Sequence, residues 1–191
     1  YVDQPEADWA RRSAMEVLGN GLSYANHHED ALSVREAELA MERRLDAPEE
    51  SILATQSNLA NTYQKLGRLE EAMPLRREVY SGRLRLNGAE DEETLRAALN
   101  YAASLHDLKR FEETKEYLRE KVPVAQRVLG ENQDLTLSMS AVYAMALYKD
   151  GGATLADLRE AVTTLEDATR IARRVLGGAH PTTKGIEYTL R

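Results

Sequence analysis

The chain repeats itself about every 42 residues. One phrase occurs three times, and a threonine follows each copy six residues after its final glycine. The copies are Arg85-Leu86-Asn87-Gly88, Arg127-Val128-Leu129-Gly130 and Arg174-Val175-Leu176-Gly177, and the threonines are Thr94, Thr136 and Thr183. Glycines and threonines alike are spaced by 42 and then by 47 residues. Two landmarks therefore share one period and one insertion, which is typical of stacked helical hairpins that bury their apolar sides against their neighbours.

Aligning the repeats divides the chain into units. A single array covers residues 1–191, with units at about 9–50, 51–92, 93–134 and 135–181 and a fifth, cut-off unit at 182–191. The five additional residues of the fourth unit fall near Asp150. Thr154, three residues before Asp157, is expected to cap the helix that follows. The insertion therefore lengthens a turn and leaves the stack undisturbed.

Each unit contains two stretches with helical periodicity. In the second unit, apolar residues such as Leu53 and Leu59 recur at helical spacing until Gly67 breaks the pattern. A second stretch runs from Leu69 to Asn87, where Gly88 supplies a C-terminal stop. The sequence therefore predicts an all-α fold of stacked antiparallel helix hairpins.

Composition and charge argue against some classes of protein. The net charge of -7 argues against a protein that follows nucleic-acid phosphates. Residues 1–92 carry 18 acidic against 11 basic side chains, which indicates either a solvated acidic face or guidance of a basic partner. The chain has no cysteine, and no apolar run approaches the roughly 18–20 residues that span a bilayer. We expect a soluble protein without membrane insertion, cytoplasmic by default.

Catalytic and metal sites are not expected. Adjacent residues on a helix point about 100° apart, so His27 and His28 make a poor metal site. Acidic pairs such as Glu70-Glu71 and Glu112-Glu113 recur at equivalent places in successive units. Recurrence indicates solvated helix starts that complement the helix dipole, whereas a catalytic pair occurs once. We predict no catalytic residue, no cofactor-binding residue and no metal ligand.

Several landmarks resemble the tetratricopeptide-repeat (TPR) family, in the 42-residue variant found in kinesin light chains. They are Asn58-Leu59-Ala60, Tyr63, Gly67, Leu69, Glu71-Ala72-Met73-Pro74-Leu75, the Leu-x-Gly closures, and Val175 to Thr183 between two repeats. Lys109 and Asn26 depart from this pattern by standing where glycine is usual. The resemblance implies a right-handed α-solenoid that serves as a scaffold or adaptor for protein–protein interaction.

The resemblance also implies that the first helix of each hairpin lines a concave groove. Helical spacing then nominates the residues that face a partner. They are Asn20 and Tyr24 in the first unit, Asn58, Asn61, Gln64 and Lys65 in the second, Arg96, Asn100 and His106 in the third, and Tyr148 in the fourth. Only Lys65 and Arg96 are cations here, so a clamp for a terminal carboxylate is not expected.

Asn58, Asn61 and Asn100 admit two interpretations. A carboxamide both donates and accepts, so it can bind the backbone of an extended peptide whatever its sequence. Alternatively, these asparagines bond neighbouring turns and stabilise the stack. For the whole chain we expect a noncatalytic module that binds a peptide or partner protein in its groove. The alternative is a structural subunit of a larger complex, held through convex helices or exposed array ends.

Overall fold

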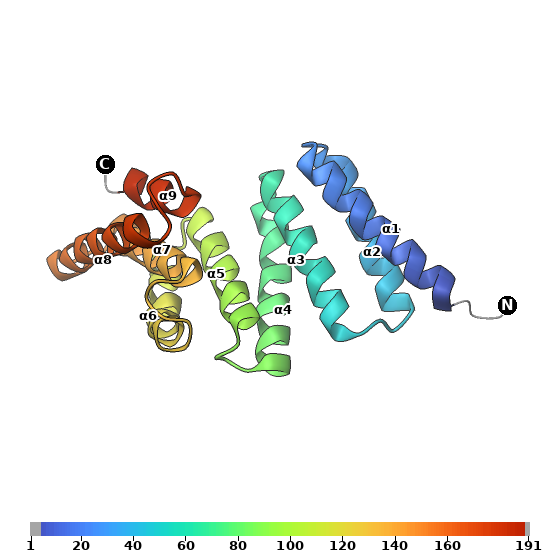
Figure 1. The fold of residues 1–191 in the computed structure, drawn as a ribbon, viewed down its shortest axis with the longest axis horizontal. Helices are drawn as coiled ribbons and strands as arrows, with labels where there is room; N and C mark the ends of the chain where they lie inside the picture. Colours follow the sequence, from blue (N-terminus) through green and yellow to red (C-terminus); the bar gives the residue numbers. More distant parts are fainter. Residues whose placement is uncertain (1–4, 190–191) are drawn as a thin grey trace. The chain divides into compact units, whose positions relative to one another are not determined.

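The computed structural model describes residues 5–189, and that part of the chain consists of helices joined by short turns (Figure 1). The helices are α1 (Pro5–Tyr24), α2 (His28–Arg44), α3 (Glu49–Lys65), α4 (Leu69–Asn87), α5 (Glu92–Asp107), α6 (Phe111–Val128), α7 (Asp134–Lys149), α8 (Leu155–Val175) and α9 (Pro181–Thr189). The predicted all-α class is confirmed, and α4 has the bounds expected from the sequence.

The chain divides into two compact units, residues 1–86 and 87–191. In the first unit, α1 packs on α2 and α2 packs on α3. Its apolar cluster is formed by Leu32, Leu39 and Leu59. Helix α4 approaches α3 closely at Gly82, where an added Cβ would lie 2.6 Å from the Cδ2 of Leu53. Gly82 therefore lets the two helices of this hairpin pack with little space between them.

The second unit has the larger core. Helix α7 packs against α5, α6, α8 and α9, and so lies at the centre of this unit. Met139 and Leu147 on α7 are fully buried, together with Leu95, Leu118 and Ile186 from the helices around it. Thr94, Thr136 and Thr183, the recurring threonines of the sequence, are also buried. The repeat therefore marks packing positions.

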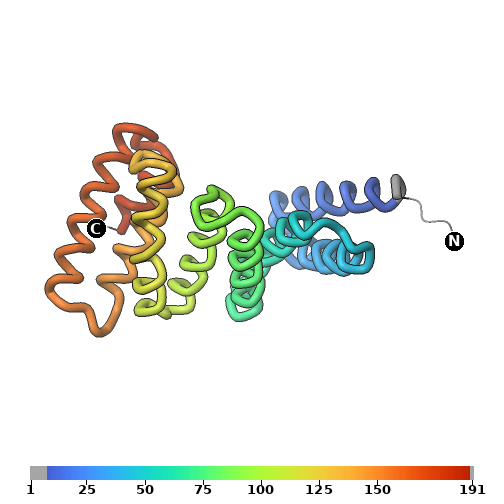
Figure 2. The backbone as a smooth tube through the Cα atoms, turned by 90° about the horizontal axis from the view of Figure 1, so that it is seen from below, coloured from blue at the N-terminus to red at the C-terminus, as the bar shows by residue number. Residues whose placement is uncertain are grey.

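Left-handed backbone recurs in the turns between helices, which Figure 2 shows as a smooth tube. Three of the turns within hairpins have it, at Asn26, Gly67 and Lys109, and each of the four described turns between hairpins has it, at Asp46, Gly88, Gly130 and Gly177. The φ angle is +73° at Gly67 and +60° at Lys109. Lys109 thus adopts the conformation that glycine has in the equivalent turn, although its Cβ disfavours it.

Replacing Lys109 with glycine is expected to stabilise the protein. The substitution relieves the left-handed conformation, and the free energy of unfolding should rise by about 1 kcal/mol. Urea denaturation followed by circular dichroism measures this. Lys184→Gly, at an exposed position inside α9, is the control and should be destabilising by about 1 kcal/mol. Equal effects of the two substitutions would contradict the interpretation.

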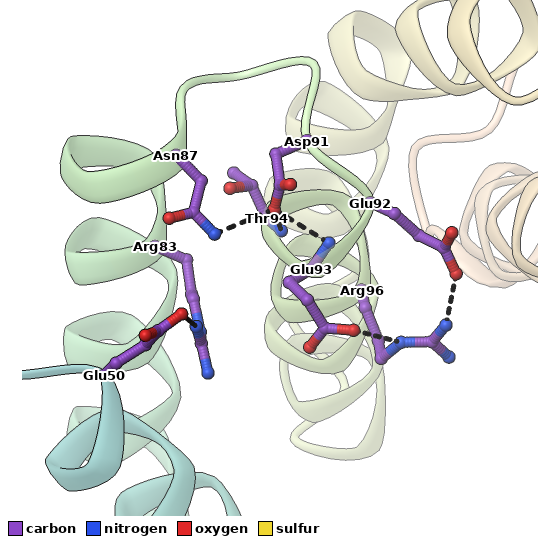
Figure 3. A network of polar contacts seen from close by, with 8 residues as sticks. All are labelled: Glu50, Arg83, Asn87, Asp91, Glu92, Glu93, Thr94 and Arg96. Carbon is purple, nitrogen blue, oxygen red and sulfur yellow. Dashed lines mark hydrogen bonds and ion pairs between the residues drawn. The ribbon is translucent and has the colours of Figure 1, made fainter.

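Side chains cap the starts of α8 and α5. The Oγ1 atom of Thr154 accepts a hydrogen bond from the backbone N of Asp157 at 3.2 Å, and the backbone N of Thr154 donates to the Asp157 carboxylate at 2.9 Å. The predicted cap at Thr154 is therefore confirmed as a reciprocal capping box. At α5, Asp91 accepts from the backbone N of Glu93 and Thr94 at 3.0 and 3.1 Å (Figure 3).

Candidate partner-binding faces

The residues that the sequence nominated for partner binding all lie on α1, α3, α5 and α7, the first helices of the hairpins. None of them is buried. The half-buried ones are Asn20, Asn58, Gln64, Asn100 and His106, and the exposed ones are Tyr24, Asn61, Lys65, Arg96 and Tyr148. All ten positions are thus open to solvent to some degree.

In the second hairpin, a buried arginine holds two of these side chains. Arg76 lies on α4 and is only 3% exposed. Its Nη2 donates to the Oδ1 of Asn61 at 2.7 Å and to the Oε1 of Gln64 at 3.1 Å. Hydrogen bonds from a charged donor are among the stronger ones in proteins. The Arg76 guanidinium therefore fixes the positions of both amides along α3.

The first hairpin repeats the arrangement. Arg35 on α2 is buried, and its Nη2 donates to the Oδ1 of Asn20 at 3.0 Å and to the backbone O of Gly19 at 3.3 Å. Burial lowers the pKa of Arg35, while Glu38 and Glu16 oppose that shift. Arg35 precedes Arg76 by 41 residues, and Asn20 precedes Asn61 by the same number. The arginine–amide pair thus belongs to the repeat within residues 1–86.

These bonds determine how the amides are oriented. A guanidinium can only donate, so each amide must turn its oxygen toward the arginine. In Asn20 and Asn61 the NH₂ group then points away from the arginine. Asn20 and Asn61 therefore form a pair of positioned amides on the first helices of this unit, which we call the amide face. Asn61 bonds within its hairpin and also remains exposed.

The second unit has apolar residues at the positions of the arginine–amide pairs. Leu118 and Leu165 occupy the positions equivalent to Arg35 and Arg76, and both are buried. Ala103 and Met145 occupy the repeat positions where the first unit has asparagine. Leucine needs no hydrogen-bond acceptor, so a small or apolar partner suffices. The amide face is therefore a property of residues 1–86.

The remaining nominated residues of the second unit have varied surroundings. Arg96 donates to the carboxylates of Glu92 at 2.6 Å and Glu93 at 3.4 Å (Figure 3). Figure 3 also shows Arg83 beside Glu50, an ion pair of 3.5 Å within the first unit. The His106 ring lies 5.2 Å from the ring of Phe111, with its Nε2 3.4 Å from the Nζ of Lys149. The charge of Arg96 is thus matched by two carboxylates at the start of its own helix.

Asn58 and Asn100 share a backbone feature. The carbonyl of Asn58 accepts from the Thr62 hydroxyl at 3.0 Å, and that of Asn100 accepts from the Ser104 hydroxyl at 3.1 Å. Both donors are buried one turn further along. The two asparagines are therefore equivalent in backbone environment, with half-buried side chains.

Sequence reasoning missed Arg35 and Arg76. Amphipathic periodicity assigns a charged residue to the solvent side, and both arginines are buried. The signal that could have found them is their common spacing with Asn20 and Asn61. A charged residue and an amide that recur together at one offset suggest a contact that the repeat preserves.

Metal sites and membrane spans were considered for residues 5–189, the part of the chain that the structure describes. No group of three or more His, Asp or Glu side chains there is arranged to hold a metal ion. No helix in this part of the chain is both long and apolar enough to cross a membrane.

Part of the chain matches a known family of repeats. Residues 51–120 match the tetratricopeptide repeat family. A solved structure of a Podosopora anserina protein with nearly identical TPR-like repeats, of the kinesin light chain kind, has a TM-score of 0.74 and 22% identity and covers 99% of this chain and 86% of its own. BtubC (BKLC) from P. vanneervenii has a TM-score of 0.76 and 18% identity, with 98% and 73% covered. No curated protein sequence matches the chain. At these identities the likenesses establish the fold.

Proposed function

Because the chain carries tetratricopeptide repeats and has the fold of kinesin-light-chain-like repeat structures, we propose that it is a noncatalytic protein–protein interaction module. Its ligand is an extended segment of a partner protein, bound along the first helices of the hairpins. The observation that carries this proposal is the amide face of residues 1–86, whose donors are held in place by Arg35 and Arg76.

The chemistry suits a peptide backbone. An extended segment presents carbonyl oxygens at regular intervals, and each of these accepts from an N–H donor. The amides of Asn20 and Asn61 turn their NH₂ groups away from the arginines that hold them, on the first helices of two successive hairpins. Because Arg35 and Arg76 already fix these side chains, binding costs less side-chain entropy than it does for free amides. Because these amides bind the peptide backbone, they select an extended conformation of the partner. Any preference for the partner's sequence then comes from other side chains near the amide face.

Asn61→Asp tests this proposal and spares the fold. Aspartate keeps an oxygen for Arg76 but replaces the NH₂ donors with an acceptor that repels a carbonyl. We expect at least a tenfold loss of affinity, which is about 1.4 kcal/mol, for peptides selected on the full chain from a random-sequence display library. Fluorescence anisotropy of the labelled peptides measures it.

The matched control is Asn132→Asp, which adds the same charge in the turn after α6. It should leave affinity unchanged, and combining Asn61→Asp with Asn58→Asp and Asn100→Asp should abolish binding. Unchanged affinity in the triple variant, with a native circular dichroism spectrum, would show that these asparagines do not contact the partner.

A second candidate function is a structural subunit of a larger complex. It is favoured by the large apolar side chains that α1 exposes, since Trp9, Val17, Leu18 and Tyr24 are between 52% and 90% exposed. Several such side chains on one helix favour burial against another protein surface. Size-exclusion chromatography with light scattering separates the two functions. A monomer supports the peptide-binding module, and obligate association supports the structural subunit.

A further inference from the structure

A pocket lies between the N-terminal half of α1, the C-terminal end of α2 and the turn that leads to α3. Its volume is about 480 Å³. Trp9 and Met41 contribute apolar walls, and Glu42 lines the pocket among several charged residues. We call it the α1–α2 pocket. It involves none of the residues of the amide face, so it requires a separate explanation.

Glu42 is the unusual member of this pocket. Its side chain is only 2% exposed, and its Oε2 has no hydrogen-bond partner among the described residues. A buried carboxylate that lacks partners is costly, and proteins normally pair such a group. The cost is removed when a cation or another donor reaches the carboxylate from the pocket.

The surrounding charge makes that ligand a cation. Glu38, one turn before Glu42 on α2, is also buried. Burial and the negative charge of Glu42 and Glu16 raise the pKa of Glu38 to about 7. Two neighbouring carboxylates thus compete for one low-dielectric space, and a positive charge there stabilises both. Arg12 and Arg44 also line the pocket, but neither forms an ion pair with Glu42 within 4.0 Å in the part of the chain that the structure describes.

The walls indicate what carries the cation. Trp9 is 64% exposed, so its indole is available to a ligand. An indole binds the alkyl stem of arginine or lysine and attracts its charged end through the ring face. A free metal ion or a small amine would leave this apolar wall unused. The excess of acidic residues over residues 1–92 also favours the approach of a basic partner.

We propose that the α1–α2 pocket receives an arginine or lysine side chain from a partner protein, with the Glu42 carboxylate as its counter-ion and Trp9 against its stem. This inference rests on the proposed function only for the premise that the partner is a protein. The site lies on the first hairpin, at residues 8–48, and it adds a charge-specific contact to the sequence-tolerant amide face.

The chain contains a single tryptophan, so its fluorescence reports on the pocket directly. The probe is acetyl-Gly-Arg-Gly-amide, titrated into the full chain, with acetyl-Gly-Gln-Gly-amide as the neutral comparison. We expect a saturable change with the arginine peptide and none with the glutamine peptide. Glu42→Gln should weaken binding of the arginine peptide at least tenfold. Because Glu42 has no partner to lose, this variant should remain folded, which circular dichroism verifies.

Glu70→Gln, at an exposed position on α4, is the matched control and should bind the probe like the unmodified protein. Equal binding of both peptides, or an unchanged affinity in Glu42→Gln, overturns the proposal. Saturation by acetyl-Gly-Glu-Gly-amide instead would assign the pocket to an anion held by Arg12 and Arg44. Asn61→Asp should leave this titration unaltered, so failure of the pocket and failure of the amide face are told apart.

Discussion

Truncating Leu118 to alanine is expected to lower the free energy of unfolding by about 2–5 kcal/mol. Leu118 lies on α6 and is fully buried in the cluster that also contains Leu147 of α7. Removing its branched end takes apolar atoms out of a close-packed site and leaves a cavity that neighbouring helices cannot fill completely. We expect the second unit to lose this stability, because its core is built around α7, which packs on four other helices there.

Chemical denaturation of the full chain, followed by circular dichroism, measures this loss as a lower urea midpoint. Leu158→Ala is the control, because Leu158 on α8 is 40% exposed and its side chain buries less apolar surface than that of Leu118. It should change the free energy of unfolding by less than about 1 kcal/mol. If Leu118→Ala were as mild as Leu158→Ala, α6 would not be anchored through this residue.

Glu38→Gln is expected to stabilise the protein at pH 8 and to have no effect at pH 4. Burial raises the pKa of Glu38 to about 7, with Glu42 on its own helix and Glu16 on α1 adding to the shift. Arg35 and Arg12 oppose it. In the unfolded chain the group has its ordinary pKa of 4.5. Between these values the folded protein holds a proton that the unfolded chain has lost.

The sign of the pH dependence follows from this difference. Below pH 4.5 Glu38 is protonated in both states and carries no penalty. As the pH rises to 7, the contribution of this group to stability is lost, at about 1.4 kcal/mol for each unit of pKa difference. Glutamine removes the dependence, so Glu38→Gln should be more stable than the unmodified protein by about 3 kcal/mol at pH 8.

Urea denaturation at pH 4, 6 and 8 checks this expectation. The gain from Glu38→Gln should grow with pH, whereas Glu70→Gln, an exposed site on α4, should give no gain at any pH. A gain that is constant across the three values would mean that Glu38 titrates normally in the folded protein.

Much of the fold could be predicted from the sequence because packing follows the repeat. The recurring glycines and threonines mark turns and buried positions. The cap at Thr154 could be predicted because Thr154 and its partner Asp157 lie three residues apart. Lys109 and Asn26 looked like departures from the pattern, yet both have the left-handed backbone that the turn requires. The turn geometry is set by the helices on either side, and the side chain accommodates to it.

The candidate sites were only partly predictable. Periodicity on the first helices found exposed amides such as Asn61, because one helix determines which side chains share a face. It did not find Arg76 or Glu42, since both are charged and a pattern of polar and apolar residues places charges in solvent. Their burial depends on what the facing helix offers, which is acceptors for Arg76 and no partner for Glu42. Such pairings lie between helices and leave no trace in the periodicity of either one.

The exchange of arginine and asparagine for leucine and alanine between equivalent hairpins constrains how this array can be re-engineered. A consensus sequence averaged over the units would choose the residue at each repeat position independently of the position that faces it. It could then set arginine opposite Ala103, which buries a guanidinium without an acceptor, or leucine opposite Asn61, which discards the positioned amide. Transferring a hairpin to another place in the array therefore requires that the arginine or leucine be transferred together with the residue that faces it. The interchangeable part of this protein is the two-helix unit with its facing pair intact.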